Sequence, residues 1–464
     1  MEPFRLSAGQ LADLYRDRAL SPVEVMRAVL ARAEAWGGNG LYLLAPERAL
    51  ADAELSQARW RRGEPSSPLD GVPVTVKDNI RTIGEPTPLG TAASESDLAR
   101  DDSPPAARLR EAGAIPFAKT TMPDYGMTSS GLSSFHPLTR NPWDFERNPG
   151  GSSAGAAAAA AAQVGPIHIG TDIGGSIRLP AGWCGVFGLK PSFGRVPIDP
   201  PYLGRAAGPL TRSVDDCALA MAALAKPDAR DSMALPPETL DWRIAPAPLD
   251  GLKIGLWLEA GCGVECAPVV RAAVQAAALK LFGEGAIIAP IKPFMTPDAL
   301  RGFDRFYRMR SWVEIKRLPE ARKNQILPFV RQWAEGAAHY SAEDVFDGVT
   351  RLHALRGAVA GALANVDFLI SPTAPMTAFS AVESAPSGDP ADPFSHIGFT
   401  FPFNVGEQPA ASLCCGHDAE GLPIGLQIVG RRFDDLGVLR LAKALEGLLE
   451  RERKPWPEPP FPKP

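Results

Sequence analysis

The sequence predicts an α/β fold, in which helices and strands alternate along the chain. A run of alternating β-branched residues over 70–79 follows a turn and ends in charge, as a short buried strand does. An alanine-rich helix is followed by a strand over 164–170, so helix and strand patterns succeed one another. At 464 residues the chain is long enough for one large core or for two domains.

Capping residues and apolar patterns predict the first helices and strands of the chain. Ser21 and Glu24 form a capping box, with proline at the first helical position, which predicts a helix to about Trp36. A helix from about residue 106 and an apolar strand over 114–118 follow the strand at 70–79. These alternating elements extend the α/β pattern toward the middle of the chain.

The second half of the chain begins with a different pattern. Helical and aromatic segments over about 225–347 predict a variable cap or insertion. Strand patterns return at 367–372 and 421–430, and a final helix is expected over about 436–449. The proline-rich end, 454–464, is expected to form an extended tail.

Composition and charge narrow the class of protein. Hydrophobic residues make up 45% of the chain and charged residues 22%, which is ordinary for a globular protein with a sizeable core. The small net charge of −5 and the lack of long basic runs argue against a nucleic-acid partner. No apolar stretch is long enough to predict a membrane span, and the charged N-terminus does not resemble a signal peptide. We therefore expect a cytoplasmic location and a small-molecule partner.

The cysteine and histidine residues favour neither a disulfide scaffold nor a metal centre. Six cysteines are sparse for this length, and Cys262 and Cys266 lack a second pair of ligands to complete a zinc site. The six histidines are scattered, without a His-x-x-x-His pair. We expect neither a metal nor a cofactor.

Two glycine-rich turns, at 150–155 and 170–176, flank the alanine-rich helix and the strand at 164–170. A glycine-rich turn before a helix can hold a phosphate. However, no Gly-Lys-Ser/Thr follows the first turn, and no Gly-x-Gly-x-x-Gly is present. Both turns carry serine and a strand ends at Lys77, so a nucleotide-binding loop is the weaker interpretation.

The two serine turns and the lysine together resemble the amidase signature family. The resemblance covers essentially the whole chain except the middle region, and the motifs occur in the family's order. They lie at 71–78 (Gly-Val-Pro-Val-Thr-Val-Lys-Asp), 148–155 (Asn-Pro-Gly-Gly-Ser-Ser-Ala-Gly), 170–178 (Gly-Thr-Asp-Ile-Gly-Gly-Ser-Ile-Arg), 184–191, 208–212 and 421–430. The resemblance implies a single domain over 1–464, with a three-layer α/β/α fold around a large mixed sheet.

The resemblance also implies catalytic roles. Ser176 corresponds to the family's nucleophile, Lys77 to its base, and Ser152 to the bridging serine, whose peptide bond to the preceding glycine is cis. The intervals between these three residues agree with the family's usual spacing. No member of the triad is substituted.

Other site residues are implied in the same way. The backbone N–H groups of Ile173, Gly174, Gly175 and Ser176 correspond to the family's oxyanion hole. Met127 falls where the family's backbone contacts the substrate. Consecutive small residues suit an oxyanion hole because they let the backbone approach the developing negative charge.

The chemistry explains why these residue types are needed. A serine hydroxyl is a poor nucleophile at pH 7 until a base takes its proton. A lysine can be that base only when it is neutral, which requires burial and nearby positive charge or dipoles to lower its pKa from about 10.4. Ser152 would relay the proton by accepting it from Ser176 while donating to Lys77.

Several neighbouring residues have a plainer interpretation. Asp172 and Arg178 are expected to form an ion pair that holds the Ser176 turn, rather than to bind substrate. His136 and His168 lie near the motifs, but no Gly-x-Ser-x-Gly elbow accompanies them, which argues against a Ser-His-Asp triad.

The leading functional prediction is a catabolic amidase, similar to aryl acylamidases and urethanases, that cleaves a small or medium neutral amide, anilide or carbamate. The aromatic residues of the middle segment are either core or pocket: Phe303, Phe306, Tyr307, Trp312 and Trp333. The alternative within the family is the amidase subunit of a glutamine-dependent tRNA amidotransferase. The stretch after Gly-Leu-Lys-Pro, at 192–202, departs from the pattern of those subunits. An inactive binding scaffold is a third hypothesis, which the intact triad disfavours.

Overall fold

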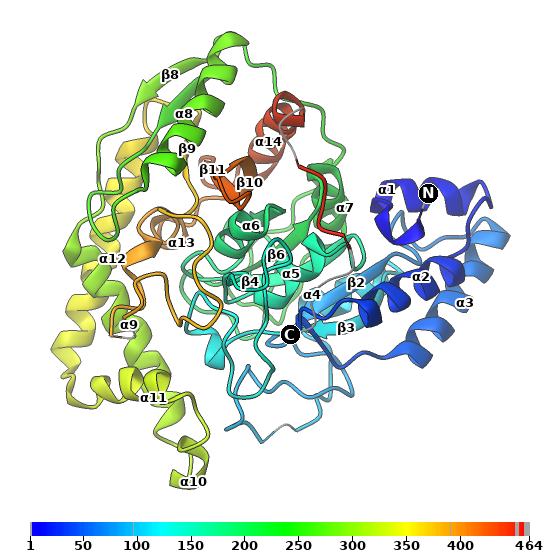
Figure 1. The fold of residues 1–464 in the computed structure, drawn as a ribbon, viewed down its shortest axis with the longest axis horizontal. Coiled ribbons are helices and arrows are strands. Elements are labelled where there is room, and N and C mark those ends of the chain that lie inside the picture. The colour runs from blue at the N-terminus through cyan, green and yellow to red at the C-terminus, as the bar shows by residue number, and fades with distance from the viewer. Residues whose placement is uncertain (1, 96, 390, 451–453, 459–464) are drawn as a thin grey trace.

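The computed structural model describes residues 2–95, 97–389, 391–450 and 454–458. Within these residues, eleven strands form one sheet in the order β1-β3-β2-β4-β6-β5-β10-β11-β9-β7-β8 (Figure 1). The strands are β1 (Leu41–Tyr42), β2 (Pro73–Lys77), β3 (Ile115–Thr120), β4 (Ile167–Asp172), β5 (Phe187–Lys190), β6 (Ala206–Thr211), β7 (Lys253–Leu256), β8 (Ile287–Pro290), β9 (Phe368–Pro372), β10 (Ala410–His417) and β11 (Pro423–Val429).

Strand directions in the sheet are mixed. β2 runs parallel to both β3 and β4, whereas β6 is antiparallel to β4 and to β5. The pairs β10–β5, β10–β11 and β11–β9 are antiparallel, and β7 is parallel to β8 and β9. The predicted α/β fold around a large mixed sheet is therefore confirmed.

Helices cover the sheet and extend beyond its two ends. The α-helices are α1 (Ala8–Arg16), α2 (Pro22–Ala35), α3 (Pro46–Arg62), α4 (Pro104–Glu111), α5 (Ala154–Ala161), α6 (Arg178–Cys184), α7 (Val214–Leu224), α8 (Pro268–Gly283), α9 (Pro297–Ile315), α10 (Glu320–Lys323), α11 (Pro328–Glu335), α12 (Ala342–Leu363), α13 (Pro402–Val405) and α14 (Asp435–Leu449). Helices α1 to α3 gather at one end of the molecule and α9 to α12 at the other (Figure 1). No helix in the described part of the chain is long and apolar enough to cross a membrane.

The local signals of the sequence act as expected in the first half of the chain. Ser21 caps α2 in a reciprocal capping box with Glu24, and the helix ends just before Trp36. β2 is buried along its whole length, which explains its continuous apolar and β-branched composition. Helix α5 consists of alanine and one glycine and is buried on every side, so it packs between the sheet and α6 without bulky side chains.

The region 225–347 is not helical throughout. β7 and β8 lie in it and extend the sheet through β9, while α8 packs against β9 and β10. Both strands are short and partly exposed at the sheet edge, so they lack the buried apolar pattern that marks β2. A cap over 225–347 and a single domain over 1–464 remain predictions. Of the tail at 454–464, residues 459–464 lie outside the described residues, and 454–458 adopt neither helix nor strand.

Candidate active site

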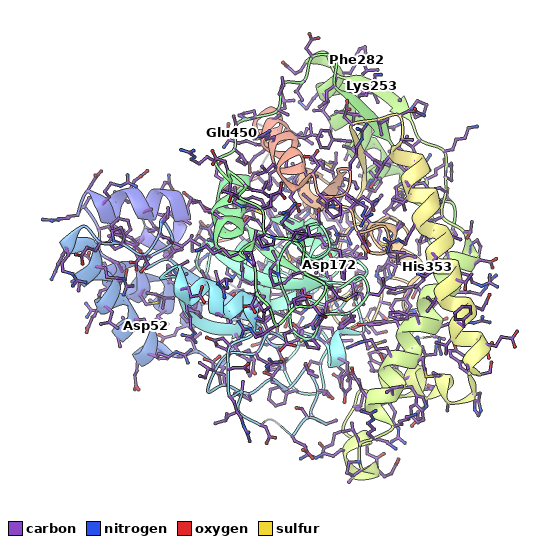
Figure 2. All side chains as sticks on the ribbon, turned by 180° about the vertical axis from the view of Figure 1, so that it is seen from behind. Asp52, Asp172, Lys253, Phe282, His353 and Glu450 are labelled. Carbon is purple, nitrogen blue, oxygen red and sulfur yellow. The ribbon has the colours of Figure 1, made fainter. Side chains whose placement is uncertain are left out.

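Sheet topology brings the two serine turns and the lysine together. β2 ends at Lys77 and pairs in parallel with β4, with Val76 opposite Ile169, so both strands end at the same edge of the sheet. β4 leads into the turn that carries Ser176, and α5 begins just after Ser152. Asp172, the last residue of β4, lies in the middle of the molecule (Figure 2).

The Lys77 amine is enclosed by hydroxyl groups. Lys77 is fully buried, and its Nζ donates to Ser152 Oγ at 2.8 Å, to Ser153 Oγ at 3.1 Å and to Thr171 Oγ1 at 3.2 Å. Burial and then the positive charge of Arg205 lower the pKa of Lys77 to about 7, against the opposing effect of the Asp172 and Asp78 carboxylates. A substantial fraction of this amine is therefore neutral near pH 7.

The turn before Ser152 is held by Asn148 and requires glycine. The peptide bond between Gly151 and Ser152 is cis, as the resemblance implied. Asn148 Oδ1 accepts from the backbone N–H of Gly150 at 2.9 Å. A Cβ on Gly151 would lie 2.6 Å from the backbone nitrogen of Ser130, so no side chain fits there.

The two serine turns are joined directly. The backbone N–H of Ser153 donates to the carbonyl oxygen of Ser176 at 3.1 Å. Ser152 is buried, whereas Ser176 is partly exposed and lines the same cavity. Both serines thus line one cavity, and Ser152 Oγ also contacts the buried Lys77 amine.

The Asp172–Arg178 ion pair holds the turn that carries Ser176. Arg178 donates to Asp172 through Nε at 3.0 Å and Nη2 at 2.9 Å, and both side chains are fully buried. Asp172 also accepts from the backbone N–H groups of Gly175 at 2.9 Å and Ile177 at 3.0 Å. Burial acts to raise the pKa of Asp172, but Arg178 holds that pKa well below its usual range. The expected structural ion pair is confirmed.

The four predicted oxyanion-hole amides are not equivalent. The N–H of Gly175 already donates to Asp172, so this group positions the turn and is not open to a substrate oxygen. The N–H groups of Ile173, Gly174 and Ser176 have no protein acceptor among the described residues. Gly175 has φ 128°, and a Cβ there would lie 2.5 Å from Thr400 Oγ1, which explains its need for glycine.

A narrow cavity of about 20 Å³ opens over Ser152 and Ser176. Met127 does not line it: its side chain is buried, and its Sδ accepts from Ser311 Oγ at 3.2 Å. The cavity is lined by Asn79, Tyr125, Gly126, Ser152, Thr171, Asp172, Ile173, Ser176, Tyr202, Arg205 and Tyr307. The two residues that precede Met127 therefore form this wall, and a backbone contact from Met127 to substrate stays a prediction.

Sequence reasoning did not single out three of the cavity residues, Tyr125, Tyr202 and Arg205. Tyr202 and Arg205 follow the Gly-Leu-Lys-Pro motif in a stretch without helix or strand periodicity, so no local pattern marked them. Of the aromatic residues expected in the middle segment, Tyr307 lines the cavity. Phe303 lies behind the turn, where a Cβ on Gly174 would be 3.3 Å from its ring.

The histidines near the motifs are engaged elsewhere. His136 Nε2 pairs with Asp78 Oδ2 at 2.8 Å, and His168 contacts Thr75 Oγ1 at 2.8 Å and the carbonyl oxygen of Gly165 at 3.2 Å. Burial lowers the pKa of His168 to about 3. Neither histidine lines the cavity at Ser176. Among the described residues, no three His, Cys, Asp or Glu side chains are grouped to hold a metal ion.

Comparisons with known proteins show the family of the chain. The sequence model of the Amidase family matches residues 24–439. A glutamyl-tRNA(Gln) amidotransferase subunit of Moorella thermoacetica is 36% identical, over 98% of this chain and 99% of that protein. The solved structure of a bacterial aryl acylamidase of the amidase signature family matches with a TM-score of 0.89 and 28% identity, over 96% of each chain. That of 6-aminohexanoate cyclic dimer hydrolase matches with a TM-score of 0.87 and 27% identity, over 96% of this chain and 97% of that chain. The chain belongs to the amidase signature family.

Proposed function

We propose that the chain hydrolyses the carbonyl–nitrogen bond of a small or medium neutral amide, anilide or carbamate. The observation that carries this proposal is the buried Lys77 amine, hydrogen-bonded to Ser152 at the base of a cavity that also holds Ser176. In this proposal Ser176 is the nucleophile, Ser152 relays protons and Lys77 is the base. No step calls for a cofactor.

The hydrogen bonds around Lys77 support a relay through Ser152. A neutral amine has two hydrogens and one lone pair, so one of its three hydroxyl neighbours must donate to it. Ser153 Oγ already donates to the carbonyl oxygen of Thr171 at 3.2 Å, which leaves it to accept from Lys77. Ser152 is the nearest of the three, at 2.8 Å, and is the natural donor to the lone pair.

The reaction then follows two steps. Ser176 Oγ bonds to the substrate carbonyl carbon as its proton passes to Ser152, and the Ser152 proton passes to Lys77. The N–H groups of Ile173, Gly174 and Ser176 stabilise the oxyanion. The amine leaves with the proton returned through Ser152, and an acyl ester remains on Ser176. Water attacks this ester by the same proton route and releases the acid.

The cavity walls are mainly polar, and it is their tyrosine rings that favour a neutral, partly apolar substrate. Three tyrosines, Tyr125, Tyr202 and Tyr307, line the cavity, and apolar or aromatic walls are usual in sites for small organic ligands. Phe303 and Ile397 lie behind Gly174, each 3.3 Å from the position of a Cβ there.

The single acidic side chain of the described cavity lining also favours a neutral substrate. Asp172 is the one acidic side chain among the described lining residues, and it is already bound by Arg178 and Asn404. The ammonium group of glutamine would therefore find no unpaired carboxylate in this lining. Such a site suits an acyl group without a positive charge.

Glutamine-dependent amidotransfer is the second candidate function. It is favoured by the 36% identity to the Moorella thermoacetica amidotransferase protein over nearly the full length of both chains. In that case the chain would act on glutamine and work with further subunits. The lack of an unpaired carboxylate for the ammonium group of glutamine in the described cavity lining argues for the hydrolase instead.

A substrate panel separates the two functions. We would measure kcat/KM for a p-nitroanilide, an aryl carbamate, a simple aliphatic amide and glutamine, with Ser176→Ala as the blank. The proposal expects the anilide or carbamate to be preferred. A preference for glutamine of tenfold or more would sink it in favour of amidotransfer.

A further inference from the structure

Arg205 reaches the cavity from the residue just before β6, the strand that pairs with β4 on the side away from β2. It immediately precedes β6, and the next residue, Ala206, pairs with Asp172 at the end of β4. Arg205 therefore stands at the same sheet edge as the Ser176 turn. It is 6% exposed and lines the cavity with Ser152 and Ser176.

The guanidinium of Arg205 is incompletely satisfied. Its Nη1 donates to the carbonyl oxygen of Pro200 at 2.7 Å, and its Cζ lies 5.1 Å from the ring centroid of Tyr202. No carboxylate of the described residues lies within ion-pair distance of it, and its buried Nε has no acceptor among them. Nε is enclosed, but Nη2 also has no acceptor among the described residues and is not enclosed, so it is the group that can donate to a ligand oxygen in the cavity.

Arg178 provides a direct contrast. This second buried arginine donates to Asp172, to the carbonyl oxygen of Thr400, to Gln427 and to Asn404. Its nitrogens are used to hold the turn. Arg205 differs in lining the cavity while its Nη2 has no acceptor among the described residues.

The charges around Lys77 favour a neutral oxygen over a carboxylate as the acceptor for Arg205. Arg205 acts to lower the pKa of Lys77, while Asp172 and Asp78 act to raise it. A second guanidinium, that of Arg310, lies 4.2 Å from the Tyr202 ring centroid. A substrate carboxylate beside Arg205 would cancel its field and favour the protonated, non-basic amine. A neutral oxygen would satisfy the donor and leave that field in place.

We propose that Arg205 is a substrate-recognition residue that donates to a neutral carbonyl oxygen carried by the substrate in addition to the scissile one. The favoured substrates are thus oxo-acyl amides, or amides with a second amide or ester carbonyl in the acyl group. This inference rests on the proposed function, because it assigns the second carbonyl to the substrate of the Ser176 site.

Binding to the Ser176→Ala protein tests the inference without turnover. The ligands are the p-nitroanilides of 3-oxobutanoate and 4-oxopentanoate, their methylene analogues butanoate and pentanoate, and the succinate half-amide. We expect one oxo ligand to bind about tenfold or more tightly than its analogue, as for a hydrogen bond to a charged donor. Arg205→Met, added to Ser176→Ala, should remove that preference, and Arg310→Met should retain it.

Three results would overturn the inference. One is an oxo preference that survives Arg205→Met, the second is its absence in the Arg205-containing protein, and the third is tightest binding by the succinate half-amide. If Arg205→Met does not fold in a thermal melt, Arg205→Lys decides, because it keeps the charge but lacks the forked guanidinium that carries Nη2. A wild-type protein that shows the oxo preference yet turns over only glutamine would reject the proposed hydrolase and leave this recognition role intact.

Discussion

Lys77→Met should make the protein more stable at neutral pH while abolishing turnover. Methionine is of similar length and uncharged, so it can fill the buried space of Lys77 without the amine. In the folded protein, burial and then the positive charge of Arg205 lower the pKa of Lys77 from 10.5 to about 7. Below pH 7, that difference makes the protonated amine cost about 5 kcal/mol of folding free energy.

Lost hydrogen bonds oppose this gain. Ser152, Ser153 and Thr171 each lose the Lys77 amine as a partner. Ser153 still donates to the carbonyl oxygen of Thr171, and the Thr171 hydroxyl still accepts from Asn79, so Ser152 alone of the three is left without a partner among the described residues, at a cost of about 1–3 kcal/mol. The variant should therefore be more stable than the wild type by about 2–4 kcal/mol at pH 6.

The extra stability of Lys77→Met over the wild type should decrease as the pH rises. The folded pKa, about 7, lies below the unfolded value of 10.5, so the folded protein binds fewer protons between these limits. Wild-type stability consequently rises with pH across this window, and the cost of the amine is fully present only below about pH 7. The advantage of Lys77→Met should shrink by about 3 kcal/mol between about pH 6 and pH 9.

Urea unfolding of both proteins across this pH range measures the effect. Lys226→Met, at an exposed position, is the control and should show no pH-dependent difference from the wild type. A difference between wild type and Lys77→Met that stays constant from pH 6 to pH 9 would refute the reasoning. It would mean that the amine keeps the same proton affinity in the folded and unfolded states.

Three further outcomes follow from the site. Ser176→Ala should lose both turnover and labelling by a fluorophosphonate, seen by intact-protein mass spectrometry, while its melting temperature stays near that of the wild type. Wild-type kcat/KM should rise with pH through about 7 as Lys77 loses its proton; an acid-side limb that persists in Lys77→Ala would assign it to another group. Arg178→Met should destabilise the protein by about 3–5 kcal/mol in thermal unfolding, because the buried Asp172 charge loses its partner. Full stability of that variant would contradict the pairing.

The sequence was informative where the chemistry is local. Lys77 at the end of a strand, and serines in two glycine-rich turns, were recognisable because short motifs specify their own backbone. The Asp172–Arg178 pair could be anticipated for the same reason, whereas the cis peptide before Ser152 was implied only by the resemblance to the amidase signature family. The final helix, expected over about 436–449, forms as α14.

Features that depend on distant partners were missed. Arg205 follows no local pattern, and its place beside Lys77 arises only when β6 pairs with β4. β7 and β8 are four residues each and partly exposed, so their strand character depends on the neighbouring β9. Gly175 was assigned to the oxyanion hole because sequence cannot show that its N–H is already taken by Asp172.

Helix α5 is packed so tightly that its residues tolerate no larger side chain. It is built from alanine and one glycine, and a Cβ on that glycine, Gly155, would lie 2.0 Å from the carbonyl oxygen of Gly40. It runs for about 12 Å from the Ser152 turn and packs against β4 and α6, so a larger residue along it would push these elements away from the helix. Mutagenesis for new substrates should therefore leave α5 unchanged and vary the cavity residues Tyr125, Tyr202 and Tyr307.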